Sequence, residues 1–204
     1  AVDYKTNVTF ADDHCVTSVG SATGFHCPAG APLSQNNPGL KLAYPTDIIP
    51  LLPPIPPCTG TAYYDKKGDG KIHEEAGYEG LGSVWTGNFD DHPWAPGIYC
   101  ITDAGGNIHD TVSGTGVTFY ILDTDFTMKY NGGGSFAAQA PTTGTYAGVL
   151  MFSYITATPC TQNLEFRGNG SAGIVGTIFM PSACIDWRGN SIADMDRVQL
   201  IGYN

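Results

Sequence analysis

The residues best suited to chemistry lie in the segment 65–76, which reads D-K-K-G-D-G-K-I-H-E-E-A. Asp65 and Asp69 stand four positions apart, and Gly70 follows directly. Hard cations such as Ca²⁺ take about six to eight oxygen ligands from carboxylates, backbone carbonyls and water, and a glycine permits the sharp turn that gathers them. The pattern therefore predicts a calcium-binding loop, with Ca²⁺ as the one cofactor that the sequence suggests.

This loop resembles the calcium loop of EF-hand and dockerin modules. Two positions depart from that pattern, because Lys67 stands at position 3 and Ala76 at position 12 of the loop. A glutamate near the end of the loop would have to replace the missing carboxylate. The alternative is a tight Gly-Asp-Gly turn between two strands. The predicted ligands are Asp65, Asp69, the carbonyl of Lys71, and Glu74 or Glu75.

Two further groups of acidic residues lack the partners that catalysis requires. Asp90 and Asp91 precede His92 in an aromatic, proline-rich loop without a second cluster. Asp123 and Asp125 are predicted to share one face of a strand, as in a calcium-dependent, polysaccharide-active β-helix, but nothing places an arginine opposite them. That enzyme is the least favoured hypothesis, and we predict that the chain is not an enzyme.

Six cysteines, an even number without any Cys-x-x-Cys spacing, predict three disulfides in an oxidising compartment rather than a zinc or redox site. The layout of the chain predicts the pairs Cys15–Cys27, Cys58–Cys100 and Cys160–Cys184. Such bridges are typical of secreted proteins, so the predicted location is extracellular or at the cell surface.

The composition excludes several classes of partner. A net charge of −10 argues against nucleic acid and against an anionic membrane surface, since both require basic patches. The apolar runs are too short to span a bilayer, and no signal segment precedes Ala1, which suggests a mature or processed product. Only 14% of the residues are charged, while 27 glycines and 14 prolines interrupt the chain at short intervals, which predicts an all-β fold.

The stretch 116–190 predicts a short, irregular β-solenoid, in which successive strands stack as coils. Runs of β-branched and aromatic residues alternate with Gly-Asn and Gly-Ser corners, and F-R-G-N at 166–169 recurs as W-R-G-N at 187–190, an offset of 187 − 166 = 21 residues. A strict offset would stack Glu165 on Asp186, which is unfavourable for like charges. A diagonal arrangement of opposite charges is therefore predicted, as an outer ladder that faces water.

Residues 1–57 are predicted to form a first strand, a disulfide loop and an extended, proline-rich strap, and residues 58–204 the solenoid-like domain with its loop at 65–76. Proline removes backbone donors and keeps the preceding residue extended, so we expect polyproline II conformation in the strap. Its apolar side chains must cover a surface, either on their own domain or on a neighbouring subunit. These side chains are Ile48, Ile49, Leu51, Leu52 and Ile55.

Five motifs in a fixed order resemble the extracellular part of the TadE/TadG-like pilus-assembly family, which is associated with bacterial tight-adherence (Flp-type) systems. The match covers residues 44–190 and implies a role at the cell surface or in an appendage. The motifs are P-P-C at 56–58, P-G-I-Y-C at 96–100, S-G-T-G-V-T-F-Y at 113–120, A-P-T-T-G-T-Y-A-G-V-L at 140–150 and G-T-I-F-M-P-S-A at 176–183.

These features together predict a secreted structural subunit of a bacterial filament or pilus-associated appendage. The last predicted strand, Val198–Asn204, has no polar cap, and an open strand edge favours head-to-tail pairing with another copy or with pilus components. Val198 and Leu200 are therefore predicted assembly residues, together with the strap. The alternative is a monomeric adhesin or carbohydrate-binding module, with Trp85 and Trp94 as exposed platforms for surface glycans.

Overall fold

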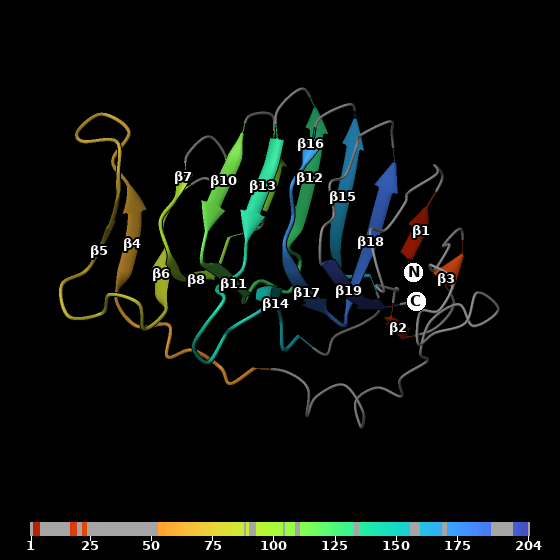
Figure 1. Ribbon diagram of the computed structural model, residues 1–204, viewed down its shortest axis with the longest axis horizontal. Helices are drawn as coiled ribbons and strands as arrows, with labels where there is room; N and C mark the ends of the chain where they lie inside the picture. Colours follow the sequence, from red (N-terminus) through yellow and green to blue (C-terminus); the bar gives the residue numbers. More distant parts are fainter. Residues whose placement is uncertain are drawn as a thin grey trace.

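The structure, a computed structural model, consists of strands and loops without any helix in the part of the chain that it describes (Figure 1). The all-β class is thereby confirmed for these residues. Among them, no helix offers the length and apolar character that crossing a membrane requires. The described residues are 2–4, 17–19, 22–23, 53–87, 89, 93–103, 105–108, 111–132, 135–155, 160–168, 171–188 and 198–203.

The described strands form three sheets, in which all neighbours are parallel except the antiparallel pair β4 and β5. The nine-stranded sheet contains, in spatial order, β2 (Thr17–Val19), β19 (Val198–Tyr203), β17 (Gly176–Met180), β14 (Val149–Phe152), β11 (Val117–Ile121), β8 (Gly97–Ile101), β6 (Ser83–Trp85), β4 (Thr61–Tyr64) and β5 (Ile72–Glu74). The six-stranded sheet contains β3 (Ala22–Thr23), β1 (Val2–Tyr4), β18 (Ala183–Arg188), β15 (Gln162–Gly168), β12 (Thr127–Gly132) and β9 (Gly105–Ile108). The four-stranded sheet contains β16 (Ser171–Ala172), β13 (Ser135–Gln139), β10 (Val112–Thr115) and β7 (Pro93–Trp94).

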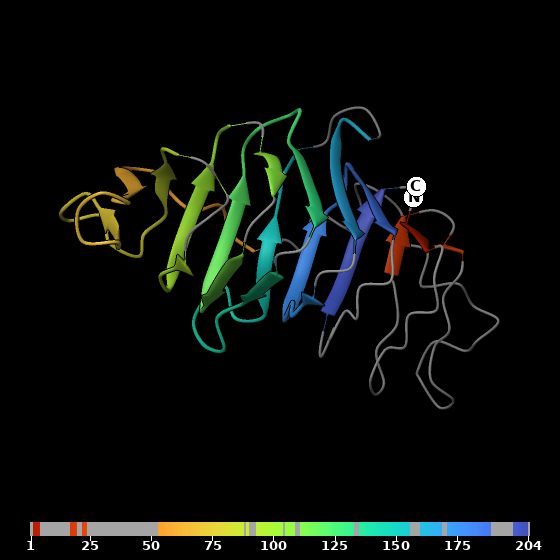
Figure 2. The ribbon, with the colours of Figure 1, turned by 90° about the horizontal axis from the view of Figure 1, so that it is seen from above.

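The chain visits the three sheets in rotation, so equivalent strands lie side by side along the long axis (Figure 2). The strands β7, β10, β13 and β16 belong to the four-stranded sheet, the strand after each belongs to the nine-stranded sheet, and the next belongs to the six-stranded sheet. The spacing of paired residues is irregular. Thr127 pairs with Gly105, 127 − 105 = 22 positions earlier, and with Asn163, 163 − 127 = 36 positions later.

Alternate residues of the strands face an aromatic core between the sheets. Val117, Phe119 and Ile121 of β11 are fully buried, as the two-residue period of a strand dictates. Trp85 and Trp94 are only 4% and 3% exposed, and the ring centroids of Trp94 and Phe119 lie 4.8 Å apart. The prediction of exposed tryptophan platforms is therefore wrong, because β6 and β7 direct both side chains into the core.

A second apolar layer covers the outer face of the nine-stranded sheet. It contains Tyr146 and Tyr154 beside two stacked rings of β11 and β14, whose centroids are 4.7 Å apart. The Tyr154 hydroxyl donates to the Pro53 carbonyl (2.8 Å), and the Tyr146 hydroxyl donates to the Pro54 carbonyl (2.9 Å). The described end of the strap thus packs on its own domain, in the manner of a polyproline segment on an aromatic surface.

The two repeated motifs stack in strict register, so the predicted diagonal arrangement is wrong. Strand β15 pairs Glu165 directly with Asp186 of β18, at an offset of 186 − 165 = 21 residues. Glu165 is also 7% exposed, and it therefore does not face water as predicted. On its other side lies Lys129 of β12, whose Nζ is 3.9 Å from Oε1 of Glu165. This cation, from the preceding round, offsets the repulsion between the stacked carboxylates.

Each of two disulfides connects a cysteine outside the strands to a strand further along the chain. The bridge Cys58–Cys100 joins the strap to β8 with a Cα–Cα distance of 5.7 Å, and Cys160–Cys184 joins the segment before β15 to β18 with a Cα–Cα distance of 4.7 Å. These are the pairs predicted for these four cysteines. The predicted pair Cys15–Cys27 lies outside the described residues. Disulfides are compatible with an oxidising compartment.

Candidate functional site

The predicted calcium loop lies in the hairpin of β4 and β5, at one end of the molecule (Figure 1). Antiparallel pairing sets Tyr63 opposite His73, and residues 65–71 close the turn. The N–H of Asp65 donates to the Lys71 carbonyl (2.9 Å), and the N–H of Gly70 donates to the Asp65 carbonyl (3.0 Å). Gly70 has φ = 68°, a value that favours glycine. The segment therefore forms the turn of a β-hairpin.

The carboxylates of the turn accept hydrogen bonds from its backbone. Oδ1 of Asp65 accepts from the N–H of Gly68 (2.8 Å), and a Cβ at Gly68 would collide with this carboxylate. Oδ1 of Asp69 accepts from the N–H of Lys71 (3.1 Å). Short aspartate side chains commonly bond to the backbone two or three residues further on, and these bonds restrict their orientation. Both carboxylates are therefore held in place by the turn itself.

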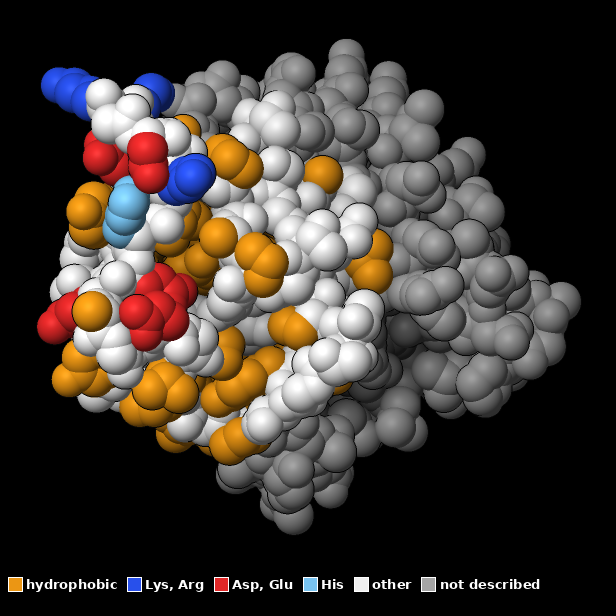
Figure 3. Space-filling model, turned by 60° about the vertical axis from the view of Figure 1, so that its left-hand side comes forward, with side chains coloured by type: hydrophobic (Ala, Val, Ile, Leu, Met, Phe, Trp, Pro, Cys, Tyr) orange, Lys and Arg blue, Asp and Glu red, His pale blue; other side chains and the backbone are white. Residues whose placement is uncertain are grey.

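His73 brings an imidazole to these carboxylates. Its Nε2 lies 2.9 Å from Oδ1 of Asp69, and its ring stacks on Tyr63 with the centroids 5.5 Å apart. This hydrogen bond is the main cause that lowers the pKa of Asp69 below its ordinary value of 3.8. Ligand atoms of Asp65, Asp69 and His73 all lie within 4.8 Å of one another. Acidic and histidine side chains gather accordingly on this face (Figure 3).

His73 was not among the ligands predicted from the sequence. A signal was present, because a histidine four positions after Asp69 follows a Gly-Asp-Gly turn. In an antiparallel hairpin, a residue shortly after the turn returns alongside the residues before it. Reading the segment as a hairpin rather than as a calcium loop would have placed His73 near Asp65 as well.

The other predicted ligands are engaged elsewhere in the hairpin region. The carbonyl of Lys71 takes part in the backbone pairing of the turn. Oε2 of Glu74 accepts from the N–H of Gly80 (2.8 Å), and Oε2 of Glu75 accepts from the N–H of Thr61 (3.2 Å). The structure therefore does not gather the five predicted ligands, and calcium binding here stays a prediction that only two carboxylates would support.

The remaining acidic candidates do not form a site in the described ranges. Asp123 and Asp125 lie in the turn after β11, where the N–H of Asp125 donates to Oδ1 of Asp123 (2.9 Å). The prediction that they share a strand face is wrong, because β11 ends at Ile121 and the aspartates form the corner that follows. Residues 90–92 lie outside the described part of the chain.

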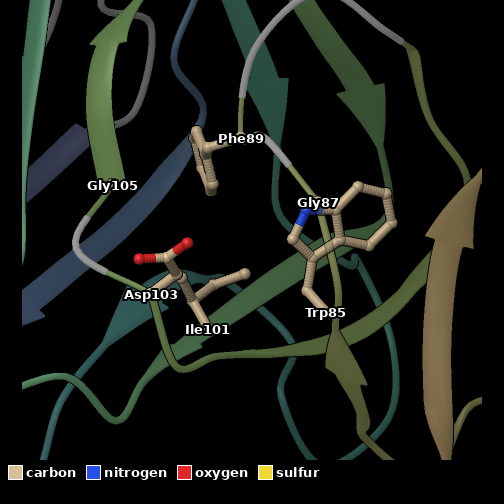
Figure 4. A pocket seen from close by; sticks show the side chains of 6 residues that line it. All are labelled: Trp85, Gly87, Phe89, Ile101, Asp103 and Gly105. Carbon is tan, nitrogen blue, oxygen red and sulfur yellow. The ribbon is translucent and has the colours of Figure 1, made fainter.

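A small pocket opens beside β6, β8 and β9, near the same end of the molecule (Figure 4). The carboxylate of Asp103 points into it, opposite the Phe89 ring. Binding sites for small molecules combine an apolar wall with several convergent polar groups. Here a single charged side chain faces mainly apolar neighbours, so we assign no ligand to the pocket. Its lining residues are Trp85, Gly87, Phe89, Ile101, Asp103 and Gly105.

At the end of the molecule that contains β18 and β19, strands from the beginning of the chain extend the sheets. Strand β19 pairs with β17 on one side, and on the other side Ile201 of β19 pairs with Thr17 of β2. The prediction that β19 is an uncapped edge is therefore wrong, because an N-terminal strand completes its pairing. The predicted assembly residues Val198 and Leu200 lie within this paired strand, opposite residues of β17.

The opposite end combines strand edges with exposed apolar side chains. Among the described residues, β7 and β9 are the outermost strands of their sheets at this end. Apolar side chains are spread over this face (Figure 3), and we call the four large exposed ones that fall within residues 55–81 the end patch. The predicted strap residues Ile48, Ile49, Leu51 and Leu52 lie outside the described ranges. The end patch consists of Ile55 (57% exposed), Tyr63 (47%), Tyr78 (36%) and Leu81 (51%).

Comparison with known proteins gives no relative from which a role could be transferred. No family model, no curated protein and no solved structure matches this chain.

Proposed function

We propose that this chain is a secreted structural subunit of a bacterial cell-surface filament or pilus-associated appendage, and that its strands form the coils of a short, irregular β-solenoid. Three features support the proposal. The chain visits three parallel sheets in rotation, its disulfides suit an oxidising environment, and five sequence motifs resemble the extracellular part of TadE/TadG-like proteins. This role is structural and not enzymatic.

The observation that carries the proposal is that the two ends of the sheets present different strands as their outermost ones. At one end, strands from the beginning of the chain pair with β18 and β19, so the outermost described strands are β2, β3 and, in the four-stranded sheet, β16. At the other end, the outermost described strands are β5, β7 and β9, and the segment that holds β4 and β5 exposes the side chains of the end patch. Unlike surfaces that join head to tail make heterologous contacts, and such contacts produce filaments when the rotation does not close. Backbone groups at strand edges supply hydrogen bonds for such a joint.

Residues 53–57 of the strap contribute to this joint only through the exposed side chain of Ile55. The disulfide Cys58–Cys100 and the hydrogen bonds from Tyr146 and Tyr154 hold residues 53–57 on their own domain. These residues therefore do not reach far onto a neighbour, although Ile55 remains exposed as part of the end patch. We accordingly assign the joint to the sheet ends, with Leu81 and Tyr78 as its main apolar contacts.

Sedimentation velocity over a range of protein concentrations tests the proposal. We expect the purified chain to form species larger than a monomer, and we expect their average size to increase with concentration without a limiting closed oligomer. Leu81→Asp places a charge in the end patch and should return the chain to a monomer. A single monomeric species of the unaltered chain at every concentration would contradict the proposal.

A further inference from the structure

We propose that Asp65, Asp69 and His73 bind one borderline divalent metal ion, of the class of Zn²⁺, at the tip of the hairpin. This inference concerns a different property from self-assembly, and it does not depend on the proposed filament. It also differs in chemistry from the calcium loop predicted from the sequence, because an imidazole nitrogen replaces the carboxylates of Glu74 and Glu75.

The three donors already lie at distances that a small change can make suitable for a metal ion. Their ligand atoms lie within 4.8 Å of one another, and Nε2 of His73 is 2.9 Å from Oδ1 of Asp69. Bonds of about 2.0–2.2 Å to a tetrahedral Zn²⁺ ion place neighbouring donor atoms about 3.3–3.5 Å apart. A slight separation of Asp69 from His73 and an approach of Asp65 meet this requirement, and all three side chains are partly or fully exposed and can adjust.

The donor types select the class of ion. Imidazole nitrogen suits Zn²⁺, Co²⁺ and Ni²⁺, whereas Ca²⁺ requires about six to eight oxygen ligands. The site offers two carboxylates, and the nearest further glutamates, Glu74 and Glu75, bond to the backbone of Gly80 and Thr61. Three protein ligands leave at least one position for water, as in open zinc sites.

Neighbouring groups orient the ligands toward one another before any ion binds, and only small shifts are needed. The ring of Tyr63 stacks on His73, and backbone N–H groups donate to Asp65 and Asp69. Such outer contacts orient metal ligands and raise affinity, because less freedom is lost on binding. Lys71 acts in the opposite direction, since its positive charge lies close enough to lower the pKa of Asp69. Lys66 and Lys67 belong to the same turn, so we expect weaker binding than at a closed site with four ligands.

Isothermal titration of the metal-free full chain with ZnCl₂, and separately with CaCl₂, tests the site. We expect saturable binding of Zn²⁺ that includes one ion at the hairpin, and much weaker binding of Ca²⁺. The decisive variant is His73→Phe, which keeps an aromatic ring against Tyr63 and removes the ligand nitrogen. It should weaken the binding of this ion at least tenfold, and Asp69→Asn should also weaken it. The matched control is Glu79→Gln, which removes a carboxylate outside the site and should bind Zn²⁺ like the unaltered chain.

A second measurement separates loss of the site from loss of the hairpin. The far-ultraviolet circular dichroism of His73→Phe without metal should match that of the unaltered chain, and its unfolding midpoint should be only slightly lower, because one exposed hydrogen bond is lost. Substituting Co²⁺ should give the visible absorption of a site with nitrogen and oxygen ligands, and His73→Phe should remove that signal. The chain has five histidines, so binding elsewhere must be distinguished. Zn²⁺ binding that is unchanged in a folded His73→Phe variant, no saturable Zn²⁺ binding, or tighter binding of Ca²⁺ would each overturn the proposal.

Discussion

We call the stacked parallel strands of the three sheets the body, and the β4–β5 hairpin the hairpin end. These two regions differ in how much of each strand is buried. In the body, β11 is buried over its whole length, because the core covers one face and the aromatic layer under the strap covers the other. In the hairpin, β4 buries only Ala62, while Tyr63 is 47% exposed and the turn carries charged side chains. Packing therefore fixes most of the described side chains of the body, whereas the hairpin exposes large side chains that can meet a ligand or a neighbour.

Because the hairpin end is more exposed than the body, we expect binding and assembly to involve the hairpin end. In the body, charged residues of neighbouring strands pair with one another, as Glu165 does with Lys129. The hairpin end brings together Asp65, Asp69 and His73, and Tyr63 of the end patch stacks on His73. Both of our proposals concern this end, and the following variants measure how sharply it differs from the body.

The largest expected effect is the truncation of a core ring. Phe119→Ala removes a fully buried side chain that contacts the rings of Phe89 and Trp94, and such changes lower the free energy of unfolding by about 3–5 kcal/mol. Tyr63→Ala in the hairpin should change it by less than about 0.5 kcal/mol, because the side chain is largely exposed. Urea denaturation of both variants measures the contrast, and equal losses would refute it.

The next effect concerns the bridge between strap and body. Replacing Cys58 and Cys100 by serine should lower the free energy of unfolding by about 2–4 kcal/mol, because the bridge restricts the unfolded chain. The variant should also be cleaved by protease within the released strap sooner than the unaltered chain. An unchanged denaturation midpoint, with intact protein after the same digestion, would show that the strap is held without the bridge.

A smaller effect is expected at the hydrogen bonds beneath the strap. Tyr154→Phe removes the donor to the Pro53 carbonyl and should lower the free energy of unfolding by about 0.5–1.5 kcal/mol. The control is Tyr78→Phe at the exposed end, which should leave stability unchanged. Thermal unfolding of the two variants at low protein concentration compares them, and the same midpoint for both would contradict a role of this bond.

The smallest effect is the titration of the hairpin itself. The hydrogen bond from His73 holds the pKa of Asp69 below 3.8 in the folded chain, and the bond from the Lys71 N–H acts in the same direction. Its contribution to stability is therefore present above the unfolded pKa and is lost as the pH falls through the folded pKa. Carbon-detected nuclear magnetic resonance of metal-free protein should show the pKa of Asp69 rising toward 3.8 in His73→Phe. An unchanged value would exclude the hydrogen bond as its cause.

The sequence predicted those features that depend on local pattern. The all-β class followed from the few charged residues and from the glycines and prolines that interrupt the chain at short intervals. The pairs Cys58–Cys100 and Cys160–Cys184 were predicted as well. In each instance a short segment or an ordered set of like residues carried enough information.

The features that could not be predicted depend on contacts between distant segments. The strict stacking of Glu165 on Asp186 is tolerable because Lys129 arrives from the previous round. Strand β19 has no open edge because β2, from the beginning of the chain, pairs with it. Trp85 and Trp94 lie in the core because their strands, β6 and β7, direct the side chains inward. At the hairpin, the calcium-loop motif drew attention away from His73, whose proximity to Asp65 depends on the antiparallel return of β5.

Negative-stain electron microscopy of the purified chain tests most directly whether its unlike ends join. The comparison uses Leu81→Asp in the end patch and Leu122→Asp in the body. Both variants replace an exposed leucine, 51% exposed at position 81 and 38% exposed at position 122. We predict regular fibres for the unaltered chain and for Leu122→Asp, and discrete particles for Leu81→Asp, both with calcium and with chelator. Discrete particles of the unaltered chain in both buffers, or fibres that persist in Leu81→Asp, would contradict the assignment of the joint to the hairpin end.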